Sequence, residues 1–305
     1  MENHTSVTEF IIVGLTEVAE YEMFLFLIFL CIYITTVFLN ASIVFLYIFS
    51  PNLRTPMYFF LANFSFLEIC YVSSTTPKML SVFLVEPKTI SFYGCALQMY
   101  WFLLLGTAES YMLAAMAYDR YNAICHPLLY SAIMNTKVCV QLVAGSWLIG
   151  VLNSLANTTL TFRLQFCRSR INHFLCDIPP LLKLACAETW VNEIALVIGG
   201  SIVFGSFILT MISYTQIICA ILKIQSNSGR KKSFSTCTSH FMVVTIFYGS
   251  GSMMYFQPKS SYSMSKDRTV AVMYTIIAPL LNPFIYSVRN QDVKIAVKKL
   301  ANCNI

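Results

Sequence analysis

The sequence is poor in charged residues. Only 11% of its 305 residues are Asp, Glu, Lys or Arg, whereas 57% are hydrophobic and the mean hydropathy is +0.67. A soluble domain usually carries about 25% charged residues, so polar side chains are too scarce here to cover a water-soluble body of this length. The composition therefore excludes an ordinary soluble globular fold. It predicts a protein whose main partner is the lipid bilayer.

Several functional motifs are also missing. The sequence contains no His-Glu-x-x-His run or comparable catalytic set, which argues against an intramembrane enzyme. No internal repeat is visible, which argues against a transporter, although the prolines in the last apolar run could mimic a broken helix. The net charge of +6 comes from basic residues between apolar runs, without an RNA-binding or zinc-finger pattern. It therefore indicates membrane topology and no nucleic-acid partner.

The apolar residues fall into seven long runs. A membrane-spanning helix needs about 20 such residues, so we expect one domain (1–305), an all-α bundle of seven transmembrane helices. Residues 1–21 would form a tail, 22–288 the bundle, and 289–305 a short amphipathic helix and tail on the inner leaflet. The predicted helices are 22–49, 57–83, 93–124, 138–162, 192–222, 235–256 and 269–288.

The N-terminal segment indicates how the chain is oriented. Residues 1–53 contain no Lys or Arg, and Asn3-His4-Thr5 is a glycosylation sequon. Basic residues favour the cytoplasmic side of a membrane protein, and sequons are glycosylated on the outer side. Residues 1–20 lack the features of a cleavable signal peptide, so the first apolar run must direct insertion. We expect a plasma-membrane protein with an extracellular N-terminus that is glycosylated at Asn3.

Four of the 11 cysteines are disulfide candidates. Cys167, Cys176 and Cys186 cluster in one polar stretch, and Cys95 begins an apolar run. They could pair if their side of the membrane is oxidising, but four cysteines allow several pairings and their spacing does not choose among them.

Two acidic residues, Glu68 and Glu109, fall in the middle of predicted helices. Two carboxylates that lie close together in a medium of low dielectric constant cannot both stay ionised without a cation. Two interpretations are open: the pair binds a cation, or one or both carboxyls are protonated and hydrogen-bonded.

Four motifs, each at a predicted helix end, together resemble those of a known family. Residues 53–61 read LRTPMYFFL, residues 116–121 read MAYDRY and are followed by AICHPL, residues 232–237 read KSFSTC with Ser239-His240 after them, and residues 279–286 read PLLNPFIY. In this order they resemble the vertebrate odorant receptors, a branch of the rhodopsin-like G-protein-coupled receptors. Residues 247–250, FYGS, stand where other rhodopsin-like receptors carry Cys-Trp-x-Pro, which argues against an amine or peptide receptor.

The resemblance implies a function and a mechanism. It implies a receptor that binds a small, mostly apolar odorant and activates the stimulatory olfactory G protein, raising cyclic AMP, in olfactory cilia. Use outside the nose for a metabolite stays open. Arg120 would be held by Asp119 at rest and freed on activation. The residues implied in coupling and activation are Asp119, Arg120, Tyr121, Tyr214, His240, Asn282, Pro283 and Tyr286.

The same resemblance implies several sites. It pairs Cys95 with Cys176 and Cys167 with Cys186. It places Glu68 and Glu109 around a sodium ion, the one cofactor expected, with Asn40 and Asn282 nearby. It also suggests ligand contacts at positions that helix packing alone would explain equally well. These positions are Phe102, Leu103, Gly106, Thr107, Ser110, Ile198, Gly199, Ile202, Tyr248, Gly251, Tyr255 and Thr275.

Overall fold

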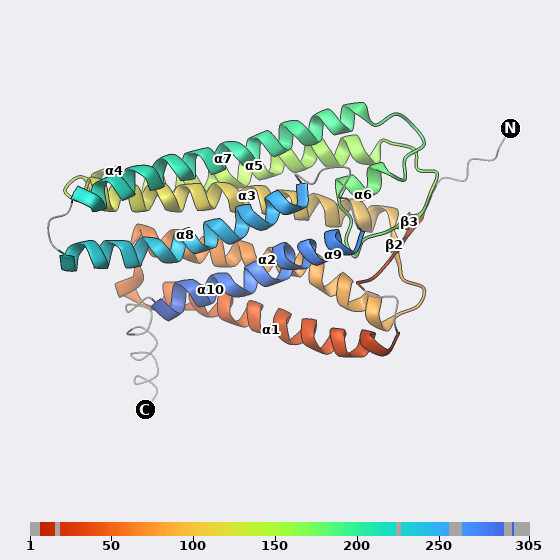
Figure 1. Ribbon diagram of the computed structural model, residues 1–305, viewed down its shortest axis with the longest axis horizontal. Helices are drawn as coiled ribbons and strands as arrows, with labels where there is room; N and C mark the ends of the chain where they lie inside the picture. The colour runs from red at the N-terminus through yellow and green to blue at the C-terminus, as the bar shows by residue number, and fades with distance from the viewer. Residues whose placement is uncertain (1–6, 16–18, 224–226, 256–263, 290–294, 296–305) are drawn as a thin grey trace.

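The protein folds as a bundle of long helices that run side by side (Figure 1). The computed structural model describes residues 7–15, 19–223, 227–255, 264–289 and 295. Six long helices are continuous, and α9, η3 and α10 follow one another to form a seventh segment. Their bounds are α1 Ala19–Phe49, α2 Pro56–Leu84, α3 Phe92–Cys125, α5 Thr136–Phe162, α7 Trp190–Lys223, α8 Asn227–Tyr255, α9 Met264–Val272, the π-helical η3 Met273–Ile277, and α10 Ala278–Arg289.

The seven predicted helices are therefore present, with ends that differ from the prediction by a few residues. The largest difference is at α8, which begins at Asn227 and not near residue 235. Its first turns are polar, so the apolar run marks the part that can lie in lipid and not the whole helix. The predicted amphipathic helix at 289–305 lies almost entirely outside the described residues, as does Asn3.

Five described helical segments are long and apolar enough to cross a membrane: Tyr21–Phe49, Pro56–Leu84, Thr136–Phe162, Trp190–Lys223 and Arg268–Tyr286. α3 and α8 fall short of that hydropathy because they carry more polar residues. For α3 the reason is position: it packs against α2, α5 and α7, and residues 104–117 are all buried apart from Tyr111. In a membrane bundle a central helix can carry polar groups that lipid would exclude.

Helix packing separates an inner from an outer surface. Phe38 of α1 and Val197 of α7 are each 68% exposed, as expected for side chains that face lipid. Inside, small residues allow close contact: a Cβ atom added to Gly150 of α5 would lie only 2.6 Å from the Leu104 carbonyl oxygen of α3. Such close approach of backbones drives helix association where no hydrophobic effect operates.

One end of the bundle, called the sheet end below, is covered by loops and a small sheet. Its strands are β1 Glu9–Ile12, β2 Thr89–Ser91 and β3 Arg170–Ile171, in the order β2-β1-β3, with β1 antiparallel to β2 and parallel to β3. Residues 1–21 are expected from the sequence to form a tail, whereas residues 9–12 form the central strand of this sheet. Two helices shorter than the predicted spans, α4 Tyr130–Ile133 and α6 Ile178–Leu182, and the 3-10 turn η1 Pro51–Leu53 complete the described fold.

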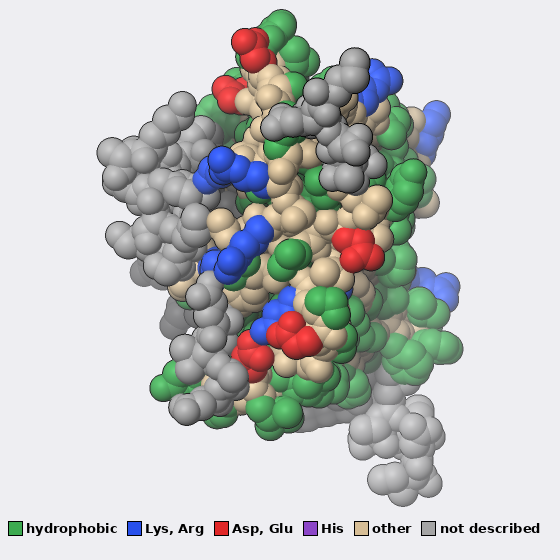
Figure 2. Space-filling view, turned by 90° about the vertical axis from the view of Figure 1, so that its right-hand side faces the viewer, with side chains coloured by type: hydrophobic (Ala, Val, Ile, Leu, Met, Phe, Trp, Pro, Cys, Tyr) green, Lys and Arg blue, Asp and Glu red, His purple; other side chains and the backbone are tan. Residues whose placement is uncertain are grey.

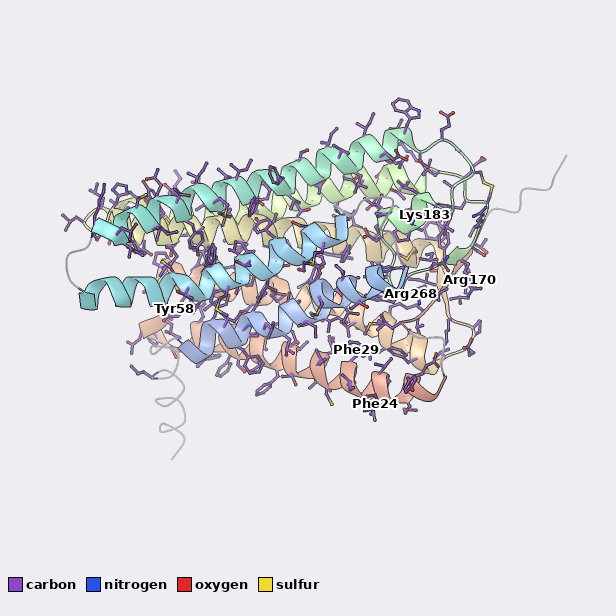
Figure 3. The ribbon with its side chains drawn as sticks, in the orientation of Figure 1. Phe24, Phe29, Tyr58, Arg170, Lys183 and Arg268 are labelled. Atoms are coloured by element: carbon purple, nitrogen blue, oxygen red, sulfur yellow. A yellow bond between two sulfur atoms is a disulfide. The ribbon has the colours of Figure 1, made fainter. Side chains whose placement is uncertain are left out.

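The sheet end is held together by covalent and ionic contacts. Cys95 is bonded to Cys176 and Cys167 to Cys186, the pairing that the resemblance implies. Lys88 pairs with Glu22 of α1 at 2.5 Å. Figure 2 looks onto this end and shows several Lys, Arg, Asp and Glu side chains on its surface. Three of the cations, Arg170, Lys183 and Arg268, are labelled in Figure 3.

Candidate functional site

An aromatic cluster surrounds Gly106 in the half of the bundle nearer the sheet end. The rings of Tyr71 (α2), Phe102 (α3) and Tyr274 (η3) lie with centroids 5.7 to 6.2 Å apart. A Cβ atom on Gly106 would approach the Tyr274 hydroxyl to 2.9 Å. The missing side chain of Gly106 therefore lets α3 and η3 approach each other beside these rings, which form an apolar and polarisable environment.

A hydroxyl network lies beside this cluster, deeper in the bundle. The Tyr248 hydroxyl of α8 lies 2.8 Å from Ser206 Oγ of α7 and donates to the Ser110 carbonyl oxygen of α3 at 3.2 Å. One phenol thus joins three helices. Because hydrogen bonds between buried groups fix relative helix positions, a ligand that displaced Tyr248 would change how α3, α7 and α8 pack.

The candidate ligand residues differ in burial and in surroundings. Phe102, Gly106, Ser110, Tyr248 and Thr275 are largely enclosed between α2, α3, α7, α8 and η3 or lie at the contacts just described. Leu103, Ile202 and Gly251 are half-buried, and the side chain of Tyr255 lies outside the described residues.

Thr107, Gly199 and Ile198 are placed differently. Asn153 of α5 donates to Thr107 Oγ1 at 2.9 Å, and its Oδ1 would lie 2.7 Å from a Cβ atom on Gly199. Thr107 and Gly199 therefore belong to the contact between α3, α5 and α7. The prediction for Ile198 is corrected, because its side chain is 57% exposed. It precedes Gly199 by one residue, a rotation of about 100° round the helix, which turns it out of the bundle.

The two mid-helix acids meet inside the bundle. Glu68 of α2 is fully buried and Glu109 of α3 is 2% exposed, and the two carboxyls interact with each other. Asn282 of α10 donates to Glu68 Oε1. Among the residues implied in sodium binding, three buried oxygens have no hydrogen-bond partner: Glu68 Oε2, Asn282 Oδ1 and Asn40 Oδ1. Oxygen acceptors without donors are the chemistry that a hard cation prefers, so these residues fit the implied sodium ion.

At the end of α3 opposite the sheet, Asp119, Arg120 and Tyr130 form a polar contact that we call the lock. Arg120 Nε donates to Asp119 Oδ2 at 2.9 Å, and the Tyr130 hydroxyl of α4 donates to Asp119 Oδ1 at 2.7 Å. Asp119 is 1% exposed. A buried carboxylate with two such partners holds the guanidinium in place, because an unpaired buried charge is costly.

Near the lock, His240 of α8 connects that helix to α7. The Tyr214 hydroxyl of α7 is hydrogen-bonded to His240 Nδ1 of α8, and the His240 ring lies 6.4 Å from the Tyr286 ring of α10. His240 and Tyr214 are also within electrostatic range of Arg120. The arrangement brings α3, α7, α8 and α10 to one point, so a shift of any of these helices disturbs the others.

Comparison with known proteins identifies this arrangement. The family model described as olfactory receptor matches residues 29–303. Mouse (Mus musculus) olfactory receptor 5AR1 is 49% identical over 98% of this chain and 97% of its own length, and human (Homo sapiens) olfactory receptor 5I1 is 48% identical over 99% and 97%. The chain belongs to the olfactory receptor family. It is therefore a multi-pass membrane protein and a G-protein-coupled receptor, not an enzyme.

The fold of this olfactory receptor also resembles a solved structure. Squid rhodopsin superposes with a TM-score of 0.74, covering 92% of this chain and 81% of the rhodopsin chain at 16% identity. At that identity the likeness concerns the fold alone. It agrees with the seven helical segments that were expected from hydropathy.

The sequence reasoning missed several residues of this olfactory receptor. Tyr71, Tyr274 and Asn153 supply the rings and the amide around Gly106 and Thr107, and Tyr130 completes the lock on Asp119. Their types gave little signal, because aromatic residues make up 14% of the sequence and an amide can equally serve plain helix packing. Tyr130 begins the short helix α4 after the MAYDRY motif, where nothing predicted a contact back to α3. The hydroxyl of Tyr121, a residue predicted to act in coupling, lies 3.1 Å from His126 Nε2.

Proposed function

We propose that this chain is an odorant receptor that binds a small, mostly apolar volatile molecule between α3, α7, α8 and η3. Its activation would engage the stimulatory olfactory G protein and raise cyclic AMP. One observation carries the proposal: α3 holds the aromatic cluster around Gly106 and, further along the same helix, the lock between Asp119 and Arg120. A change in packing at the aromatic cluster can therefore be transmitted along α3 to the lock.

The side chains of the candidate pocket limit the ligand chemistry. They are apolar, aromatic or hydroxyl-bearing, apart from the glycines, so they favour a neutral ligand bound mainly by burial of apolar surface. The Tyr248 and Tyr274 hydroxyls can each add a hydrogen bond. A ligand with one ether, carbonyl or hydroxyl group on an apolar frame would match this lining.

Activation would be a shift between two populations. A ligand that binds the open arrangement more tightly favours it, and each tenfold shift requires about 1.4 kcal/mol of differential affinity. Opening would separate α8 from α3 near His240 and release Arg120 from Asp119. The G protein would then contact Arg120 and its neighbours, including Tyr121, with Pro283 permitting α10 to bend.

The orientation belongs to the same proposal. The sheet end would face outward, in the plasma membrane of olfactory cilia, and the Arg120 end would face the cytoplasm. The absence of Lys and Arg from residues 1–53 supports this orientation. An N-terminal epitope tag that binds antibody on unpermeabilised cells is the expected result, and a tag detected only after permeabilisation would contradict it.

A bound sodium ion would stabilise the resting arrangement. Glu68, Asn282 and Asn40 would offer the oxygens named above, and Glu109 would share the negative charge. Sodium titration of basal cyclic AMP should then lower the signal in the original receptor and have little effect in Glu109→Gln. If sodium changes neither receptor, the carboxyls are better explained as protonated and hydrogen-bonded to each other.

The proposed function is tested by cyclic AMP in cells that express the chain with the olfactory G-protein α subunit. A panel of neutral volatiles should contain at least one molecule that raises cyclic AMP. Arg120→Ala should abolish that rise, whereas Arg163→Ala, an exposed cation just after α5 at the sheet end, should leave it intact. Surface amounts of all three proteins must match. Silence of a surface-expressed receptor to the whole panel would contradict the ligand class, and a response that survives Arg120→Ala would contradict the coupling.

A further inference from the structure

The two disulfides of the sheet end differ sharply in burial. Cys95 and Cys176 are each 0% exposed, whereas Cys167 and Cys186 are both exposed residues. Thiol–disulfide exchange needs an attacking sulfur to reach the bond, so access decides which disulfide reacts in a folded protein. In this receptor the Cys167–Cys186 bond is accessible to a thiol from solvent and the Cys95–Cys176 bond is not, although both lie in the same loop region.

The buried disulfide is enclosed by a hydrophobic cluster. Cys95 and Cys176 pack with Phe10 of β1, Met99 of α3 and Ile171 of β3, each of which is 0% exposed. The Cys176 amide is also hydrogen-bonded to Gln98 at 3.0 Å. An external thiol can reach this bond only if the sheet and the loop separate from α3, which requires at least local unfolding.

The exposed disulfide, in contrast, joins segments that backbone contacts also hold. The Cys167 amide donates to the Leu184 carbonyl at 3.0 Å, and the Cys186 amide donates to the Gln165 carbonyl at 2.8 Å. Phe166 pairs with Ala185 in a β-bridge, and its side chain is 8% exposed. Breaking the S–S bond would therefore leave the two cysteines side by side, so the bond could form again.

We propose that the Cys167–Cys186 disulfide is a reversible exchange site for small thiols. The thiolate of the incoming molecule forms a bond to Cys186 Sγ, the Cys167–Cys186 bond breaks, and Cys167 leaves as a thiolate. The small thiol has lost its proton to water, and the Cys167 thiolate can take one up, so atoms and charge balance. No oxidant is needed, and attack by the Cys167 thiolate on the mixed disulfide reverses the step.

The charges next to the two cysteines set the direction of attack. Arg168 follows Cys167 directly and is exposed, and a neighbouring cation stabilises a thiolate. Glu188 lies two residues after Cys186 in the sequence, and a nearby negative charge disfavours a thiolate. Cys167 is therefore the better leaving group, and a faster leaving group speeds exchange. Arg168 acts as a positioning charge and takes no part in bonding.

Tryptic cleavage makes the exchange measurable, because it places the three loop cysteines on separate peptides. Cleavage after Arg163, Arg168, Arg170, Lys183 and Lys223 puts Cys167 in 164–168, Cys176 in 171–183 and Cys186 in 184–223. The purified full chain in nanodiscs is first treated with N-ethylmaleimide to block its free thiols. It is then exposed to graded 2-mercaptoethanol, quenched with isotopically labelled N-ethylmaleimide and mapped by mass spectrometry without reduction.

The expected result is labelled maleimide on Cys167 and the mercaptoethanol adduct on Cys186, at a rate at least about tenfold above that of any change at Cys95 or Cys176. Removal of the thiol should restore the original bond. Equal reaction of both disulfides, or no reaction before the protein unfolds, would overturn the proposal. An adduct on Cys167 in place of Cys186 would overturn the assigned direction of attack.

Variants test the assigned roles separately. Arg168→Gln should slow exchange severalfold without exposing Cys95, whereas the matched Arg163→Gln should leave the rate unchanged. If Arg168→Gln and Arg163→Gln exchange at the same rate, Arg168 does not contribute to the exchange. Cys167→Ser combined with Cys186→Ser should abolish the adduct on 184–223. The experiment uses no odorant or G protein, so its outcome is independent of the proposed signalling function.

Discussion

The hydrogen bond from the Tyr130 hydroxyl to Asp119 connects the short helix α4 to the lock on α3. Removing the hydroxyl in Tyr130→Phe takes one hydrogen bond from a buried carboxylate, at a cost of about 1 kcal/mol to the resting arrangement. We expect basal cyclic AMP to rise severalfold, in line with that free energy. Tyr93→Phe, which alters an 83% exposed residue at the sheet end, is the control. Equal basal signals in the two variants would contradict the role of Tyr130.

His173 links the stability of the sheet end to pH. Its burial, and then the positive charge of Arg268, lower the pKa of His173 from 6.5 to about 4. The unfolded chain therefore binds a proton between these pH values and the folded chain does not, so stability falls as the pH drops from 6.5 towards 4. We expect about 2 kcal/mol less stability at pH 5 than at pH 7 from this group.

The measurement for His173 is the melting temperature in detergent at pH 7 and pH 5. On acidification, the melting temperature of the original receptor should fall more than that of His173→Gln, which has no ionisable group at this position. A loss of the same size in both proteins would mean that other groups cause the acid sensitivity.

At the residue scale, the charged side chains and their pairing were predictable, whereas a neutral partner such as Tyr130 was not. Asp119, Arg120, Glu68 and Glu109 stood out because charge inside a membrane helix is costly and therefore rare. Tyr274 did not stand out, because whether a ring faces the pocket or lipid depends on helix rotation. The prediction that Ile198 contacts the ligand was wrong for the same reason: Ile198 is adjacent to a buried glycine, yet its side chain points outward.

Gly150 sets the distance between α5 and α3. A Cβ atom there would lie 2.6 Å from a backbone oxygen, which cannot move as a side chain can. Gly150→Ala should therefore force the helices apart and cost about 1–3 kcal/mol, as overpacking does in other interiors. Gly145→Ala on the same helix is the matched control, because no atom lies within 4 Å of its added Cβ.

The two alanine variants are compared by surface expression and by melting temperature in detergent. Gly150→Ala should be reduced in both, and Gly145→Ala should match or exceed the original receptor, because replacing glycine inside a helix favours the helix. Equal stability of the two variants would show that α3 and α5 are not in the close contact described.

At the element scale, helices were predictable and the sheet end was not. A run such as 22–49 has few arrangements in lipid other than a helix, because every backbone group must be hydrogen-bonded within the segment. The strand Glu9–Ile12 is only four residues long and pairs with residues far along the chain. Nothing local distinguishes such a strand from a tail. The π-helical turn η3 likewise depends on packing, although it holds Tyr274 at the candidate pocket.

At the scale of the whole molecule, the two ends of the bundle serve different chemistry. The sheet end is rich in loops, disulfides and charge, and the opposite end contains the lock around Arg120. Between them lies a mostly apolar interior whose polar groups are concentrated on α3 and its neighbours. The proposed signal is a change of helix packing that both ends bias, which is the physical requirement for coupling two sites.

The most direct test of this account is a cyclic AMP dose–response curve for an active volatile, measured side by side on Gly106→Ala, Gly145→Ala and Arg120→Ala. The Cβ added at Gly106 must displace the Tyr274 hydroxyl, so Gly106→Ala should shift the half-maximal concentration by about tenfold or more and keep the maximal response. Gly145→Ala should superpose on the original receptor, and Arg120→Ala should lose the maximal response at equal surface expression. An unshifted curve for Gly106→Ala together with a full response from Arg120→Ala would contradict the account, because neither proposed site on α3 would then contribute to signalling.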